Sequence, residues 1–231
     1  MPPAPSPTNN NAAWSAKPSS FRNGSRIAAR LIDVNRRDRV LAAGGVVGPV
    51  AFVAAWTVCG AVTDGYSPVQ DAISDLAAVG APTRVAMTAG FVVFGIGVIA
   101  FGFALRAALH SRAWIAAIGT GACTIGVAAT PLGGWSGDTA HGVFAGLGYV
   151  TLVALPLLAS IPFARRGHRA WTRASRATGV IAAVCLAATT LGPMHGLWQR
   201  LGLLAGDVWI VVTALAMART TGPFADPAQR E

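Results

Sequence analysis

The chain has 231 residues and a formal net charge of +9 at pH 7, with 53% hydrophobic residues and only 12% charged residues. Because soluble domains carry about 25% charged residues, this composition excludes an ordinary globular protein whose whole surface faces water. The arginines stand in short clusters between apolar runs and form no folded basic module, so we expect no nucleic-acid partner and a multi-span protein whose main partner is membrane lipid.

The first 38 residues differ in composition from the rest of the chain. They are rich in Pro, Ser, Asn and Ala, carry several arginines and contain no apolar run long enough to bury. Such a composition is typical of disorder. We therefore expect residues 1–38 to form a disordered basic arm on the cytoplasmic side.

Six apolar runs follow, each close to the roughly 20 residues that cross a bilayer as a helix. They lie at 40–62, 85–105, 114–132, 142–164, 177–192 and 201–218. We predict an all-α polytopic bundle of six transmembrane helices over residues 39–218, with a short extracytoplasmic helix between the first and second spans. Residues 219–231 are expected to form a cytoplasmic tail.

The stretch 66–84 between the first two runs predicts that short helix. Ser67 has the form of an N-cap, Gln70 can reach back as in a capping box, and Gly80 can end the helix after about three turns. Asp71 and Asp75 then lie one turn apart and repel each other. We expect Asp75 to be compensated by an ion pair with Arg84 or Arg200, or to belong to a functional pocket.

Close helix packing is predicted by glycines spaced four residues apart, because small residues let helix backbones approach closely in lipid. Such pairs occur in the first, fourth and sixth runs, namely Gly44 and Gly48, Gly142 and Gly146, and Gly202 and Gly206. Together they favour a compact bundle over separate membrane anchors.

Orientation follows from the distribution of basic residues. Of the 18 lysines and arginines, only Arg84 and Arg200 fall on the side of the loops that follow the first, third and fifth runs. By the positive-inside rule, both termini are predicted to be cytoplasmic, in a protein of the cell inner (plasma) membrane.

The acids show the opposite distribution. The loops on the extracytoplasmic side hold Asp71, Asp75 and Asp138 together with His141 and His195, and Asp207 enters the sixth run from the same side. The few polar side chains of this apolar chain therefore gather at one face. We predict the functional site there.

Three stretches resemble a known family: "YSPVQDAISDLAAVGAP" at 66–82, the pair His141–Gly142 that opens the fourth run, and "GLWQRLGLLAGDVWIVV" at 196–212. They resemble a prokaryotic six-span integral membrane family catalogued as domain of unknown function 998. The resemblance implies a six-helix bundle with an extracytoplasmic cluster of Ser67, Ser74, Asp75, His141 and Arg200. It implies no activity.

Three functions remain open at this point. The first is the binding of a lipid or of an unknown protein partner at the outer leaflet by the polar cluster, which comprises Ser67, Asp71, Asp75, Asp138, His141, His195, Arg200 and Asp207. The second is a membrane-embedded lipid hydrolase, with Ser74, Asp75 and His141 as catalytic candidates. The third is a small-solute or proton-coupled transporter that uses Asp207.

A metal-dependent form of the hydrolase is also open. Asp138 and His141 have i, i+3 spacing at the start of the fourth run. With Asp75 and His195 they offer two nitrogens and two carboxylates, which are ligands that zinc accepts. A zinc site built from Asp75, Asp138, His141 and His195 is therefore a further hypothesis.

Overall fold

The computed structural model describes residues 1, 20–219 and 224, with side chains described from Arg36 onward. The chain divides into two units, residues 1–36 and residues 37–231. In the first unit, the described residues from Ser20 onward form the beginning of helix α1 (Ser20–Val62). The helical bundle belongs to the second unit.

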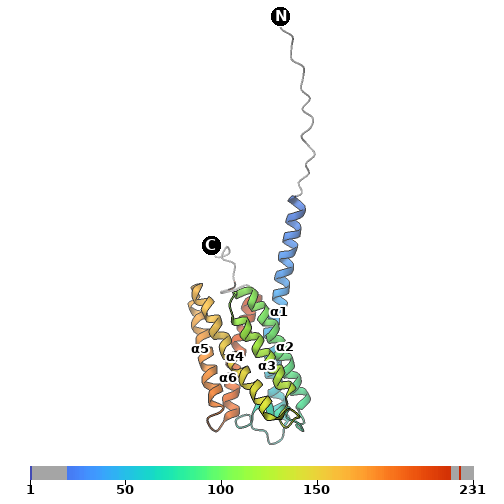
Figure 1. Cartoon of the computed structure of the whole chain (residues 1–231), viewed down its shortest axis with the longest axis vertical. Helices are drawn as coiled ribbons and strands as arrows, with labels where there is room; N and C mark the ends of the chain where they lie inside the picture. The colour runs from blue at the N-terminus through green and yellow to red at the C-terminus, as the bar shows by residue number, and fades with distance from the viewer. Residues whose placement is uncertain (2–19, 220–223, 225–231) are drawn as a thin grey trace. The chain divides into compact units, whose positions relative to one another are not determined.

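The described part of the chain is all-α, as predicted. After α1 come the 3₁₀ helix η1 (Ile73–Ala77) and five further α-helices: α2 (Arg84–Leu109), α3 (Ala113–Ala129), α4 (Gly137–Arg165), α5 (Arg169–Ala188) and α6 (His195–Ala218). From α2 to α6 each helix packs on the next, and α4 also contacts α6. Figure 1 shows these helices as a single bundle.

The helices agree with a multi-span protein. Residues 36–62 of α1, and α2, α4 and α6, give four helices that are long and apolar enough to cross a membrane. Helix α3 is apolar but has 17 residues. Helix α5 starts at Arg169, earlier than the predicted fifth run at 177–192, and ends at Ala188 because the following residues form turns. The count of six spans remains a prediction.

The expected arm at 1–38 differs from the structure over residues 20–38, which are helical. Arginine, a good helix former, is the commonest residue of this stretch, and no proline interrupts the helix before Pro49. Residues 2–19 of the expected arm, and most of the expected tail at 219–231, lie outside the described residues.

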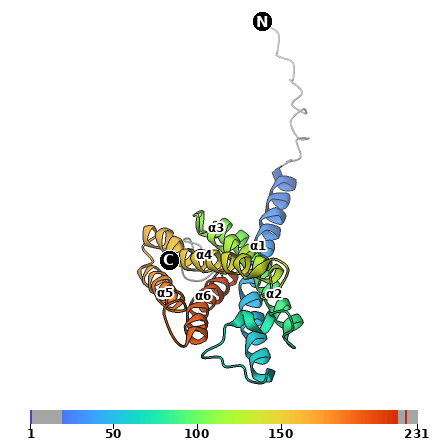
Figure 2. The ribbon, with the colours of Figure 1, turned by 60° about the horizontal axis from the view of Figure 1, so that its bottom comes forward.

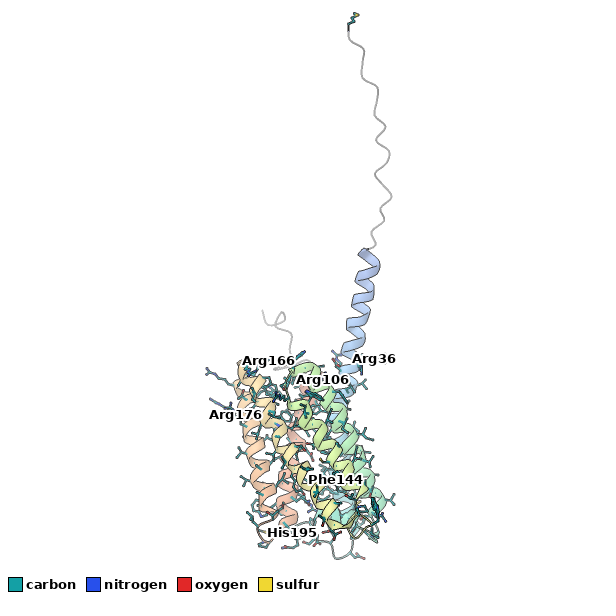
Figure 3. The ribbon with its side chains drawn as sticks, viewed as in Figure 1. Arg36, Arg106, Phe144, Arg166, Arg176 and His195 are labelled. Carbon is teal, nitrogen blue, oxygen red and sulfur yellow. The ribbon has the colours of Figure 1, made fainter. Side chains whose placement is uncertain are left out.

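The loops gather at two opposite ends of the bundle. We name the first the η1 end: it holds residues 63–83 and the α3–α4 and α5–α6 turns, and it comes forward in Figure 2. The second, the basic end, holds the α2–α3 and α4–α5 turns. Figure 3 shows Arg106, Arg166 and Arg176 at the basic end and His195 at the η1 end. The separation of charge read from the sequence is thus a separation in space.

Close helix approach occurs at two of the three predicted glycine pairs. A Cβ added at Gly44 would lie 2.5 Å from the Gly97 carbonyl oxygen of α2, and one at Gly48 would lie 3.1 Å from that of Phe94. Gly202 and Gly206 face leucine side chains of α5 and α4. At Gly142 and Gly146 an added Cβ would meet nothing within 4 Å. The prediction is therefore wrong for that third pair, which faces outward.

The short helix between α1 and α2 is present, but it is smaller than predicted. Instead of about three α-helical turns, residues 67–71 form a tight turn and only Ile73–Ala77 are helical, with 3₁₀ geometry. Ser67 does cap as expected, because its Oγ accepts a hydrogen bond from the Gln70 N–H at 3.3 Å. Ile73 and Leu76 are buried, so η1 docks on the bundle by its apolar face.

Candidate functional site

An apolar cavity of about 140 Å³ lies inside the η1 half of the bundle. Five helices supply aromatic or aliphatic walls, and η1 borders it from the loop side. Its apolar lining comprises Phe52 of α1, Phe91 and Phe94 of α2, Val127 of α3, Phe144, Ala145 and Leu152 of α4, Leu203 of α6 and Ile73 of η1. Phe144 lies in the lower half of the view in Figure 3, toward the η1 end.

His141 is the one ionisable lining residue among the aromatic walls, apart from the phenol of Tyr149. Its side chain is buried, and its Nδ1 lies 2.8 Å from the carbonyl oxygen of Thr130. A carbonyl can only accept, so Nδ1 carries the proton, and in the neutral ring Nε2 is then an acceptor. No other hydrogen bond to the imidazole is formed within the described residues. The imidazole that lines the cavity therefore has its Nε2 without a hydrogen-bond partner among the described residues.

Ser74 reaches the same cavity from η1. The position of η1 is fixed by Gln199, whose Oε1 accepts a hydrogen bond from the Ile73 N–H at 2.8 Å. The amide nitrogen of Gln199 donates to the Tyr149 hydroxyl at 2.6 Å. One amide of α6 thus joins η1 to the cavity wall on α4. Sequence analysis missed Gln199 and Tyr149, although a glutamine inside the apolar α6 was a usable signal.

Arg200 is the centre of a second cluster at the η1 end, and only 5% of its surface is exposed. Its Nη1 donates to three backbone carbonyl oxygens, those of Pro68 at 2.7 Å, Asp71 at 3.0 Å and Gly196 at 2.9 Å. Its Nη2 donates to the Tyr66 hydroxyl, and the guanidinium lies over the Trp56 and Tyr66 rings. Arg200 therefore anchors the 63–83 segment to α6.

The ion pair expected between Asp75 and Arg200 or Arg84 is not formed. Arg200 donates to carbonyl oxygens and to the Tyr66 hydroxyl, its Nε has no hydrogen-bond partner among the described residues, and Arg84 is exposed. Asp75 Oδ2 instead accepts the Ala72 N–H at 2.9 Å, and Asp71 Oδ2 accepts the Ser67 N–H at 2.7 Å. Side chains of this length commonly bond to nearby backbone and so compete with regular helix. These local bonds explain why the two carboxylates form no ion pair with an arginine and why the helix is short and has 3₁₀ geometry.

Tyr66 stabilises the same cluster as a neutral phenol. Burial raises the pKa of its hydroxyl, and this effect exceeds the opposing influence of the Arg200 guanidinium. The protonated hydroxyl donates to the Ala72 carbonyl at 3.0 Å while it accepts from Arg200. The phenol thus connects α6 to the residue that precedes η1.

The zinc candidates do not converge in the structure. No group of three or more His, Cys, Asp or Glu residues that could hold a metal ion occurs among the residues with described side chains. Asp138 Oδ1 accepts the Gly133 N–H at 2.8 Å in the α3–α4 turn, His195 is exposed at the start of α6, and Asp75 is exposed on η1. The catalytic candidates Ser74, Asp75 and His141 do not form a triad either. The Thr130 carbonyl occupies the place at His141 Nδ1 that an aspartate would take.

Asp207 lies apart from both clusters. It is 3% exposed, and neither carboxyl oxygen has a hydrogen-bond partner among the described residues. It borders a groove of about 510 Å³ between α1 and α6 whose remaining lining is aliphatic except for Thr57. The groove therefore offers no second ionisable group for a proton path.

These features define a class before any comparison is made: a multi-span α-helical membrane protein with a polar, capped end and an arginine-rich end. A family model described as "Protein of unknown function (DUF998)" matches residues 46–216, and the chain belongs to this family. The match includes the cavity, the Arg200 cluster and η1. Comparison with curated proteins and with solved structures found no match.

Proposed function

We propose that the protein binds a membrane amphiphile at the η1 end of the bundle. A short hydrocarbon segment of the ligand occupies the aromatic cavity, and a hydroxyl or amide of the ligand donates to His141 Nε2. The observation that carries this proposal is an available imidazole acceptor inside a cavity whose other walls are mainly apolar. Binding sites for small molecules commonly combine apolar walls with a few placed polar groups.

The volume of the cavity limits the ligand. A cavity of about 140 Å³ is close to the roughly 150 Å³ of an engineered apolar cavity that binds benzene. The bound segment is therefore a ring or a short branched chain, not a whole acyl chain. Phe91, Phe94 and Phe144 provide ring faces and edges for it.

The proposal includes a location. Since basic loops remain on the cytoplasmic side of inner membranes, we place the basic end in the cytoplasm and the η1 end outside, with both termini cytoplasmic. The ligand then comes from the outer leaflet of the cell inner (plasma) membrane. Support comes from the clustering of the loop arginines at one end.

A cavity-filling substitution tests the proposal. Gly148 lines the cavity, and a Cβ there makes only an ordinary contact of 3.5 Å with Cys123, whereas a Cβ at Gly146 on the same helix meets nothing within 4 Å. With a diazirine-bearing lipid probe in nanodiscs, Gly148→Leu is expected to lower crosslinking to Phe144 and Tyr149 by at least about fivefold, which corresponds to about 1 kcal/mol.

Two controls accompany this measurement. Gly146→Leu should leave the crosslinking of the cavity residues unchanged, and the exposed residues Val143 and Val150 should be labelled equally in all forms. Equal cavity labelling in wild type and Gly148→Leu would show that the ligand lies elsewhere and would refute the proposal.

A hydrolase is the second candidate, because Ser74 and His141 line the same cavity. His141 Nε2 would accept the Ser74 hydroxyl proton as Oγ attacks an ester carbonyl, and the imidazolium would return that proton to the leaving alcohol. Water would then release the acid from the acyl-enzyme. The Thr130 carbonyl would orient the ring in place of an aspartate.

A fluorophosphonate probe separates this candidate from binding alone. If the site is hydrolytic, the probe should label wild type at Ser74, and both Ser74→Ala and His141→Asn should abolish labelling. Peptide mass spectrometry locates the adduct. If wild type is unlabelled while the lipid crosslink persists, the protein is a binding protein without this activity.

A further inference from the structure

A second hollow, of about 840 Å³, lies at the basic end, far along the bundle from the aromatic cavity. It is bounded by the last turns of α2, the α2–α3 turn, the first turn of α3 and the last turns of α4. Four arginines and one histidine line it: Arg106, Arg112, Arg165, Arg166 and His110. We propose that this hollow binds the phosphate of an anionic phospholipid headgroup.

No aspartate or glutamate occurs in the lining of the hollow. Four guanidinium groups thus border one hollow with no carboxylate in its lining. Like charges gathered around one hollow repel one another, and an anion relieves that repulsion. Guanidinium groups suit phosphate because their planar array of donors forms paired, charge-assisted hydrogen bonds with it.

Two of the arginines are held in place by uncharged partners. The Arg106 guanidinium lies 4.8 Å from the centre of the Trp114 ring. Arg166 donates from Nη1 and Nη2 to the Ala108 carbonyl at 3.4 and 3.3 Å, which ties the end of α4 to α2. These contacts position both side chains without neutralising them. Figure 3 shows Arg106 and Arg166 close together at this end.

The rest of the lining favours a lipid over a free phosphate. Leu109, Trp114, Leu158, Ile161 and Pro162 form an apolar side to the same hollow. A headgroup phosphate can meet the guanidinium groups while the first carbons of its acyl chains lie on this side. Basic pockets between helix ends on the cytoplasmic side of membrane proteins bind anionic lipid headgroups in this manner.

The test compares two double variants of the full chain that remove the same charge. Arg106→Gln with Arg166→Gln removes two guanidinium groups from the hollow. Arg173→Gln with Arg176→Gln removes two from α5, outside the hollow. Each delipidated protein in neutral detergent is titrated with short-chain phosphatidylglycerol, and the bound lipid is measured by native mass spectrometry. Phosphatidylcholine and inorganic phosphate are titrated in parallel.

We expect wild type and the α5 variant to bind phosphatidylglycerol with affinities within about twofold. The hollow variant should bind at least about tenfold more weakly, because it loses two sets of charge-assisted hydrogen bonds. Weaker binding of phosphatidylcholine would support a site for net negative headgroups. Equal losses in the two double variants would indicate a general electrostatic field and overturn the proposal. Inorganic phosphate binding that depends on Arg106 and Arg166, without phosphatidylglycerol binding, would overturn the lipid assignment.

Discussion

Arg200→Met is expected to detach the 63–83 segment from the bundle and to lower the free energy of unfolding by on the order of 3–5 kcal/mol. The substitution keeps an apolar side chain of similar length but leaves the carbonyls of Pro68, Asp71 and Gly196 without their donor. One of these acceptors is buried and two are partly buried, and a fully buried acceptor that loses its partner costs about 1–3 kcal/mol. Arg200→Lys should recover little of this loss, because one ammonium cannot reproduce the planar fork of donors.

Thermal unfolding in detergent and limited proteolysis measure this effect. The melting temperature should fall, and cleavage should appear first within residues 63–83. Arg84→Met is the matched control, because Arg84 is exposed and follows the same segment; its melting temperature should stay near that of wild type. An Arg200→Met protein that melts like wild type and resists cleavage would show that the apolar contacts of Ile73 and Leu76 hold the segment without the guanidinium.

Gly97→Leu is expected to prevent α1 and α2 from packing together and to destabilise the bundle by about 3 kcal/mol or more. A Cβ at Gly97 would lie 2.5 Å from the Gly44 carbonyl oxygen and 2.9 Å from the Gly48 Cα. Both atoms belong to the backbone of the opposing helix, so no side chain can rotate away. The larger leucine would force the two helices apart and open the aromatic cavity, in which Phe52 and Phe94 come from these same helices.

Size-exclusion chromatography of fluorescent fusions in mild detergent provides the measurement. Gly97→Leu should yield little monodisperse protein, whereas Gly142→Leu should behave as wild type because its added atoms meet open space. If Gly97→Leu eluted with a normal profile and melting temperature, close packing of α1 on α2 through Gly44 and Gly48 would be disproved.

The helical bundle was predictable because span length and apolarity are properties of local sequence. The clustering of arginines at one end could also be predicted. Successive loops lie at alternate ends of the bundle, so the order of the loops along the chain gives the end of each one. Helix bounds were less accurate: α5 starts at Arg169, inside what composition suggested was a loop. Arginine is a good helix former, so charge in this stretch indicates position relative to the membrane and not the absence of helix.

The candidate site was only partly predictable. Ser74 and His141 were selected from the sequence, and they line one cavity. The partner of His141 is the carbonyl of Thr130, and the main partners of Arg200 are also carbonyls. Every residue carries a carbonyl, so sequence patterns do not distinguish the ones that bind a side chain. The prediction that Asp75 pairs with Arg84 or Arg200 was wrong for this reason. Asp71 and Asp75 instead accept hydrogen bonds from nearby backbone N–H groups.

The choice of carbonyls as partners of Arg200 has a consequence for the environment in which the protein works. Carbonyl oxygens do not titrate, and a guanidinium keeps its charge in proteins. Burial also keeps the Tyr66 phenol in its protonated form. The Arg200 cluster that holds residues 63–83 on α6 should therefore keep its hydrogen bonds over a wide range of pH, which an ion pair with a carboxylate or a histidine would not.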